Sequence, residues 1–358
     1  MLPSLGIRNY RNLKSLDIER LARVNLIAGK NNTGKTSLLE AVSLYAAGGD
    51  TEWIFELLSI RDEYQWSERE NILRRNIDSY RAIFYQRIFN DTKVEIGDLS
   101  KGSRQKLTIR IYEREILDKS TSSHPNPNIV LSIELNDVHA EGSLHQDLSS
   151  GIRDSSASSL YMLDKKFQLS TSDFQFVSTS DNLVDSNSSL WSNVALKDEE
   201  GWVVEALKII EPSIVRIAFI DTEFENVHRA IVKTKNQKET LPLQSMGDGM
   251  NRILTIILAL VNAGDGYLLI DEFENGLHHT VQEDLWKIIF KLAKELNVQV
   301  FATTHSDDCI HAFENVLNDG NQDEGQYFRL EKFGEVIKPI FYSASELQIA
   351  ADQNIETR

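Results

Sequence analysis

A glycine-rich loop between an apolar strand and a helix constrains the fold of this chain more than any other feature. Residues 29–36 read GKNNTGKT, which matches the spacing G-x-x-x-x-G-K-[ST] at every required position. The preceding segment VNLIAG is typical of a buried strand, and the following TSLLEAVSLYAA has apolar residues at helical spacing. A chance glycine turn rarely has both neighbours, so the sequence predicts a phosphate-binding loop in an α/β sheet.

Each residue type in this loop suits the phosphates of a nucleotide such as ATP. Glycine lets the backbone approach closely enough for its N–H groups to point at phosphate oxygens. The lysine supplies a positive charge to the outer phosphates, the threonine hydroxyl fits as a ligand of Mg²⁺, and the N-terminus of the helix favours anions. The predicted nucleotide-binding residues are Gly29, Asn31, Asn32, Thr33, Gly34, Lys35, Thr36 and Ser37.

Two further strands end in residues that suit nucleotide hydrolysis. YLLIDEFE has four apolar residues followed by Asp271 and Glu272. Beside a P-loop this is the Walker B pattern, in which Asp271 would orient Mg²⁺, directly or through water, and Glu272 would polarise the attacking water. FATTHS ends the next strand at His305, which would sense the γ-phosphate and hold that water. The plainer alternatives are surface acids and a hydrogen-bonded surface histidine. We therefore predict Lys35, Glu272 and His305 as catalytic residues and Thr36 and Asp271 as metal ligands.

The last third of the chain predicts a parallel sheet. The strand before Asp271 is followed by the amphipathic segment TVQEDLWKIIFKLAKELN and then by the strand VQVFATTHS. Strand, helix and strand in this order form a βαβ unit. Between them, ENGLHHT is predicted as a loop and helix start, with His278 a candidate nucleotide contact. Adjacent histidines point in different directions, which disfavours a metal site. The C-terminal segment predicts a β-hairpin and a closing helix.

Length, composition and net charge limit the possible domain organisation and cellular environment of the chain. A chain of 358 residues with one cysteine and a net charge of −16 suits two domains, or one large domain with an insertion, in a reducing cytoplasm. No apolar run predicts a membrane span, and the acidic balance argues against coating nucleic acid by global charge. Residues 50–92 look helical, and their arginines would either face solvent, which we favour, or form a local nucleic-acid surface. Residues 93–195 look β-rich with loose, Ser-rich loops.

A short polar stretch, SMGDGMNRIL, precedes a long apolar helix. A turn would account for one glycine, but Ser245 and Gly247 at the mouth of a helix suit the binding of phosphate. A Ser-x-Gly element followed by Walker B and then a histidine is the order found in ABC-type ATPases. The chain resembles the group that includes RecF, the SMC proteins and the overcoming-lysogenisation-defect (OLD) proteins. The resemblance covers about residues 1–45 and 240–310. The segments that closely resemble the OLD-like branch are GKNNTGKTSLLEAV, SMGDGMNRIL, LLIDEFENGLH and VFATTHS.

The resemblance implies an architecture and a mechanism. The expected fold class is α/β, an ABC-ATPase head with a mixed N-terminal β-sheet and a parallel P-loop sheet. Residues 1–49 and 201–358 would form the head, and residues 50–200 a helical and then β-rich insertion that serves as a partner or sensing surface. Two heads would pair head to tail around two ATP molecules, with Ser245 and Gly247 contacting the nucleotide of the other subunit. A homodimer is the minimum, and larger rings are open.

This chain departs from the usual L-S-G-G-Q signature, a change that the OLD-like branch tolerates. Gln244, Met246 and Asp248 stand where that pattern has leucine, glycine and glutamine. The departures bear directly on how strongly nucleotide drives dimerisation. Gln86 is the candidate for the glutamine of the family's Q-loop.

Three functions follow from the resemblance. The first is an ATPase that regulates a separate effector, such as a Toprim-like nuclease, in bacterial antiphage defence; the residues after His305 are too few for a Toprim domain and lack a cluster of acids suited to a two-metal nuclease. The second is a RecF-like, ATP-dependent DNA clamp. The third is a scaffold that binds nucleotide and hydrolyses it weakly. The acidic charge favours the first over the second.

Overall fold

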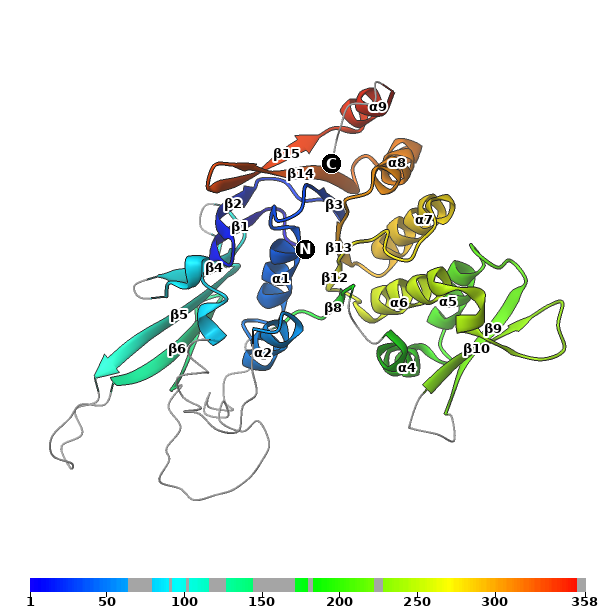
Figure 1. The fold of residues 1–358 in the computed structure, drawn as a ribbon, viewed down its shortest axis with the longest axis horizontal. Helices are drawn as coiled ribbons and strands as arrows, with labels where there is room; N and C mark the ends of the chain where they lie inside the picture. The colour runs from blue at the N-terminus through cyan, green and yellow to red at the C-terminus, as the bar shows by residue number, and fades with distance from the viewer. Residues whose placement is uncertain are drawn as a thin grey trace, which may run out of the picture.

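A computed structural model describes residues 1–63, 79–89, 92–100, 103–115, 127–143, 171–179, 183–221 and 228–352. A six-stranded sheet lies at its centre in the order β15-β14-β3-β13-β12-β8 (Figure 1). All neighbouring pairs are parallel except β14 and β15, which form the predicted antiparallel hairpin. The strands are β3 Val24–Ala28, β8 Phe174–Val177, β12 Tyr267–Ile270, β13 Gln299–Thr303, β14 Gly325–Phe333 and β15 Val336–Tyr342.

Helices cover both faces of this central sheet. The P-loop helix α1 lies on one face, and α6, α7 and α8 lie on the other (Figure 1). Successive residues of a strand point to opposite faces, so Leu268 and Ile270 join the core under α6 to α8 while Leu269 joins the core under α1. The helices are α1 Lys35–Ala46, α2 Thr51–Ile60, α4 Leu183–Val194, α5 Glu199–Leu207, α6 Asp248–Asn262, α7 His279–Glu295, α8 Asp307–Val316 and α9 Ala344–Asp352.

A second six-stranded sheet carries the N-terminus, in the order β2-β1-β4-β5-β6-β7, and every neighbouring pair in it is antiparallel. Its apolar face packs with α1 and α2 in one core. Strands β4 to β7 lie within residues 93–195, the stretch expected to be β-rich. The strands are β1 Leu5–Tyr10, β2 Leu13–Ile18, β4 Lys93–Gly97, β5 Lys106–Glu115, β6 Pro127–Leu135 and β7 Val138–Ser143.

A three-stranded sheet precedes the signature stretch, in the order β11-β10-β9. It packs with α4 and α5 against α6 (Figure 1). The largely apolar segment IVRIAFID forms β9. The bounds are β9 Ile214–Asp221, β10 His228–Thr234 and β11 Leu241–Pro242, with short helical turns at Tyr85–Arg87, Leu243–Met246 and Leu317–Asn321.

The expected βαβ unit is confirmed by β12, α7 and β13, and the α/β fold class is confirmed with it. The division of the chain into 1–49 with 201–358 and 50–200 stays a prediction. Four strands from the 50–200 range continue the N-terminal sheet, whereas β8 from the same range pairs with β12 in the central sheet. Within the described residues of the expected helical stretch 50–92, α2 is a regular helix, residues 79–81 are helical, Tyr85–Arg87 is a short helix, and the rest is turns and extended chain.

Some sequence expectations fall outside the described residues, among them residues 144–170 of the stretch expected to be β-rich and three arginines of the stretch 50–92, Arg69, Arg74 and Arg75. Arg81 and Arg87 are described, and both have local partners. The Arg81 guanidinium lies over the ring of Phe89, and Arg87 pairs with Glu63 at 3.2 Å. No helix in the described ranges is long and apolar enough to cross a membrane.

Candidate nucleotide site

The P-loop joins β3 to α1, and its two glycines occupy positions that exclude a side chain. Gly29 has a φ of 146°, and a Cβ added there would lie 2.7 Å from both the Leu330 carbonyl oxygen and Thr33 Oγ1. Gly34 has a φ of 89° and directly precedes α1. Thr33 Oγ1 donates to the Lys30 carbonyl at 2.8 Å, which closes the loop. The backbone therefore forms the tight cradle that phosphate binding requires.

Lys35 lies between this cradle and a group of carboxylates. Its Nζ donates to the carbonyl oxygens of Gly29 at 2.6 Å and Lys30 at 3.2 Å. Burial lowers the pKa of Lys35, and the charges of Asp271, Glu272 and Glu274 oppose that effect. The ammonium is thus held over the loop, close to the Walker B acids.

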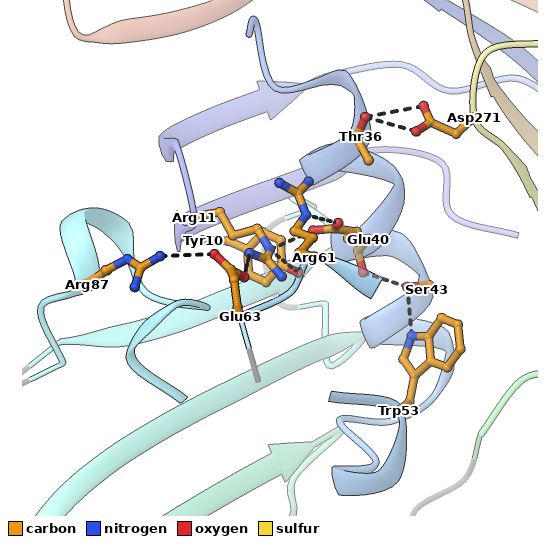
Figure 2. Close-up of polar contacts among 10 residues, drawn as sticks. All are labelled: Tyr10, Arg11, Thr36, Glu40, Ser43, Trp53, Arg61, Glu63, Arg87 and Asp271. Carbon is orange, nitrogen blue, oxygen red and sulfur yellow. Dashed lines mark hydrogen bonds and ion pairs between the residues drawn. The ribbon is translucent and has the colours of Figure 1, made fainter. Parts of the chain in front are cut away.

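The hydroxyl of Thr36 and the carboxylate of Asp271 meet across the sheet, as Figure 2 shows. Thr36 Oγ1 donates to the two Asp271 oxygens at 3.1 and 3.3 Å. Thr303 Oγ1, from the end of β13, donates to Asp271 Oδ1 at 2.6 Å and accepts from the Glu272 N–H at 2.9 Å. Oxygen atoms from a hydroxyl and a carboxylate are the ligands that Mg²⁺ prefers, so Thr36 and Asp271 fit the role of holding it.

The backbone after Asp271 is fixed from several sides. Glu272 has a φ of 48°, an uncommon conformation for a residue with a side chain. The Phe273 N–H donates to the Thr303 carbonyl at 2.9 Å. The buried guanidinium of Arg252, from α6, donates to the carbonyl oxygens of Asp271 and Glu272 at 2.8 and 3.0 Å, and to that of Ser178 at 3.0 Å. These bonds fix the backbone from which the Glu272 side chain projects.

His305 lies at the end of β13 beside the same acids. Its Nδ1 is 3.1 Å from Glu274 Oε1 and 3.9 Å from Glu272 Oε1. Its backbone N–H also donates to Glu274 Oε1 at 2.9 Å. Glu274 therefore orients the imidazole while about half of the His305 side chain stays exposed, where a γ-phosphate or a water can reach it.

The chain thus brings together most residues that the sequence singles out. Lys35, Thr36, Asp271, Glu272 and His305 form one cluster. Asn31 and Asn32 lie exposed in the loop, whereas Thr33 and Ser37 are buried.

Four other predicted residues have their described contacts with neighbours that are close to them in the sequence. Ser245 is exposed, and its Oγ donates to the Pro242 carbonyl at 2.6 Å. Gly247 has a φ of 99° and directly precedes α6. Gln86 contacts the Tyr85 hydroxyl at 3.5 Å. His278 caps α7, with its Nδ1 2.9 Å from Thr280 Oγ1.

Sequence reasoning missed Thr303, Glu274 and Arg252. The first two carry a signal, because each lies two residues from a predicted catalytic residue, Thr303 before His305 and Glu274 after Glu272. Alternate residues of a strand end share a face, which could have indicated Thr303. Arg252 carries no such signal, since a single arginine in an apolar helix predicts no particular partner.

A parallel sheet with a P-loop after one strand and Walker B acids after another defines a P-loop ATPase, and it is consistent with the ABC-type head expected from the sequence. The sequence profile of a family described as "AAA domain, putative AbiEii toxin, Type IV TA system" matches residues 24–308, and the chain belongs to this family. The fold is also similar to the SMC head domain of Pyrococcus furiosus, solved with the C-terminal domain of ScpA. The TM-score is 0.50, at 10% identity, and the match covers 99% of each chain.

Curated relatives agree with this class. An "ATP/GTP phosphatase" of Helicobacter pylori is 24% identical over 375 residues, which span 97% of each chain. The DNA replication and repair protein RecF of Cellvibrio japonicus is 55% identical over 47 residues, which are 13% of each chain. The chain is therefore similar to one relative over nearly its full length and to RecF over a short segment.

Proposed function

We propose that this protein binds and hydrolyses ATP with Mg²⁺, dimerises head to tail around the nucleotide, and regulates a separate effector protein. The observation that carries hydrolysis is the connected set Thr36, Asp271, Thr303, Glu272 and His305. It provides oxygen ligands, a carboxylate base and an oriented imidazole at one end of a parallel sheet, where ligands of α/β proteins bind.

Each residue has a role that its position supports. The P-loop backbone and Lys35 bind the β- and γ-phosphates, and Thr36 and Asp271 hold Mg²⁺, which would neutralise charge on those phosphates. Glu272 accepts a hydrogen bond from the attacking water, and His305 donates one toward the γ-phosphate. Glu274 positions His305, and Thr303 positions both Asp271 and Glu272.

The dimer is proposed because the predicted signature residues are turned outward. Ser245 is exposed, and the turn at Gly247 directs the N-terminus of α6 to the surface, where its positive end favours an anion. In the head-to-tail pair, Ser245 and Gly247 would contact the nucleotide held by the other subunit. The resemblance to the OLD-like branch supports this arrangement.

The proposal also specifies the kind of effector that the protein regulates. The matched family's description names a putative toxin of a type IV toxin–antitoxin system, which suits a protein that acts with a second component. We propose antiphage defence, with a Toprim-like nuclease as the effector. Isolating the native complex from its host and assaying its nuclease activity tests this, and a complex without a nuclease would contradict it.

Replacing the proposed base tests hydrolysis. In Glu272→Gln, we expect kcat to fall by about 100-fold or more while ATP affinity stays unchanged, because the amide cannot accept the proton from water. The matched control is Glu335→Gln in the exposed β14–β15 turn, which should leave kcat unchanged. Equal turnover in Glu272→Gln and the control would show that the Walker B assignment is wrong.

Replacing the exposed serine tests the dimer. In a Glu272→Gln background, which slows turnover, ATP should double the mass measured by light scattering, and Ser245→Arg should abolish that increase. An unchanged dimer in Ser245→Arg would overturn the proposed trans contact.

The similarity to RecF over a short segment supports an ATP-dependent DNA clamp as a second candidate function. A salt titration of DNA binding with ATP present separates the two. Tight binding that weakens steeply with salt would favour the clamp over the effector.

A further inference from the structure

A cavity of about 480 Å³ opens beside the start of α2, and none of the nucleotide-site residues named above lines it. Trp53 and Phe174 both line it, with ring centroids 4.9 Å apart at an interplanar angle of 68°. Four acidic residues also line it, namely Asp50, Glu52, Glu56 and Asp173. In the part of the chain that the structure describes, none of the four pairs with a lysine, arginine or histidine.

The lining selects the charge and shape of a ligand. Aromatic faces attract a cation, and unpaired carboxylates accept hydrogen bonds from it. A metal ion suits the cavity poorly, because no group of three or more His, Cys, Asp or Glu in the described ranges is placed to hold one. A planar guanidinium fits best, since it stacks on rings and bonds carboxylates through a fork of N–H groups. The volume is that of a small-ligand site.

We propose that this cavity binds an arginine side chain presented by a partner protein, and that its occupation acts on the ATPase site. A protein partner is favoured over a free cation because a chain with a net charge of −16 attracts a basic surface. The binding half of this proposal is independent of the function proposed above, whereas the second half rests on ATP hydrolysis.

One wall of the cavity is attached to the P-loop helix. Trp53 Nε1 donates to Ser43 Oγ at 2.9 Å, and Ser43 Oγ donates to the Glu40 carbonyl at 2.8 Å within α1 (Figure 2). The Glu40 carboxylate in turn pairs with Arg61, directly after α2, at 2.5 Å and with Arg11 at 2.6 Å. Helix α2 is therefore joined to α1 near both of its ends, so a shift of Trp53 is passed to the helix that begins at the P-loop.

The other wall is attached to the Walker B strand. The Ser172 N–H donates to the Ala46 carbonyl at the end of α1, and the Asp173 carbonyl accepts from the Tyr267 N–H at 2.9 Å. Phe174 then pairs with Tyr267 in the parallel β8–β12 ladder, which ends next to Asp271. A side chain bound between the two walls would thus hold the P-loop helix against the Walker B strand.

The test of binding uses the indole resonances of protein labelled at tryptophan, with the Trp53 signal assigned from Trp53→Phe. The probe is acetyl-Gly-Arg-Gly-amide, and its control carries citrulline, a neutral group of nearly the same shape. We expect the arginine peptide alone to shift the Trp53 signal and Glu52→Gln/Glu56→Gln to weaken binding about tenfold. Both replacements lie on an exposed helix face, and the other indole signals report that the fold is intact.

Three results would show that the cavity is not an arginine site. The citrulline peptide could bind as tightly as the arginine peptide, or Glu52→Gln/Glu56→Gln could bind the arginine peptide with unchanged affinity. The third result is that the arginine peptide does not shift the Trp53 signal at any peptide concentration. Spermidine is a further arm: tighter binding of spermidine than of the peptide would identify a free polyamine as the ligand and overturn the arginine assignment.

The test of communication compares ATPase rates with and without the peptide. We expect the peptide to change kcat in the wild type, and Ser43→Ala to bind the peptide with unchanged affinity but lose this response. Peptide binding without any change in wild-type kcat would overturn the communication while leaving the binding site intact. A protein without ATPase activity would instead contradict the proposed function, which the binding experiment does not depend on.

Discussion

Replacing Arg252 tests how the Walker B backbone is held in position. The side chain is only 3% exposed and donates to three backbone carbonyls at 2.8 to 3.0 Å, including those of Asp271 and Glu272. Methionine has similar bulk but no donor, so Arg252→Met leaves these carbonyls without their partner. At about 1 kcal/mol net for each bond, the expected loss of unfolding free energy is about 3 kcal/mol.

The catalytic effect should be larger than the loss of stability alone implies. Glu272 is held at a positive φ, and the bond from Arg252 to its carbonyl is one of the contacts that keep it there. A displacement of about 1 Å in a catalytic group costs roughly 100-fold in rate. We expect kcat to fall about 100-fold in Arg252→Met, with ATP affinity unchanged, because Arg252 holds the Walker B backbone whereas the P-loop would bind the phosphates.

The measurements are steady-state ATP hydrolysis and urea unfolding on the same samples. The unfolding midpoint should fall by roughly 1–2 M. Thr255→Val is the matched control, since Thr255 lies buried on the same helix and bonds Asn187 and the Asn251 carbonyl instead of the Walker B backbone. If Arg252→Met loses stability like this control but keeps a wild-type kcat, Arg252 only packs the helix and the reasoning fails.

Two other predictions concern residues of the same site. Thr303→Val should raise the Mg²⁺ concentration for half-maximal hydrolysis about tenfold, because Asp271 loses its 2.6 Å bond, and Thr303→Ser should restore it; equal Mg²⁺ curves for all three proteins would contradict this role. For Lys35, burial lowers the pKa below its ordinary value of 10.5, so the unfolded chain binds the proton more tightly and wild-type stability rises with pH between the lowered pKa and 10.5. The stability of Lys35→Met should not rise in this way. If the variant is more stable than the wild type without nucleotide at neutral pH, the difference between their unfolding free energies, measured with urea, should therefore be smaller at pH 10. A difference that grows with pH would show that the pKa of Lys35 is not lowered.

Local spacing was enough to predict the P-loop and the Walker B strand. The cradle at Gly29 and Gly34 needs residues that are close in sequence, and the continuous apolar run at the start of YLLIDEFE indicates a buried strand. Thr36 and Asp271, which the sequence predicted as metal ligands, do meet, because the parallel strands of one sheet place their carboxyl ends at the same edge.

The edge of the central sheet could not be predicted in this way. The four residues of β8 pair with β12, more than 90 positions later in the chain, and so short a strand carries no signal that selects its partner. The same holds for Trp53 and Phe174, whose rings meet from α2 and β8. Contacts of this kind depend on packing between distant segments, which periodicity does not encode.

The position of Arg252 connects the two halves of the proposed active site. Helix α6 begins beside the exposed Ser245 and Gly247, which would contact the neighbour's nucleotide, and its Arg252 holds the backbone of Glu272 in its own subunit. A packed helix moves as a unit, so a displacement at its N-terminus reaches the Walker B carbonyls. Contact with one nucleotide would therefore adjust the base that acts on the other, and hydrolysis in the dimer should depend on both sites being occupied.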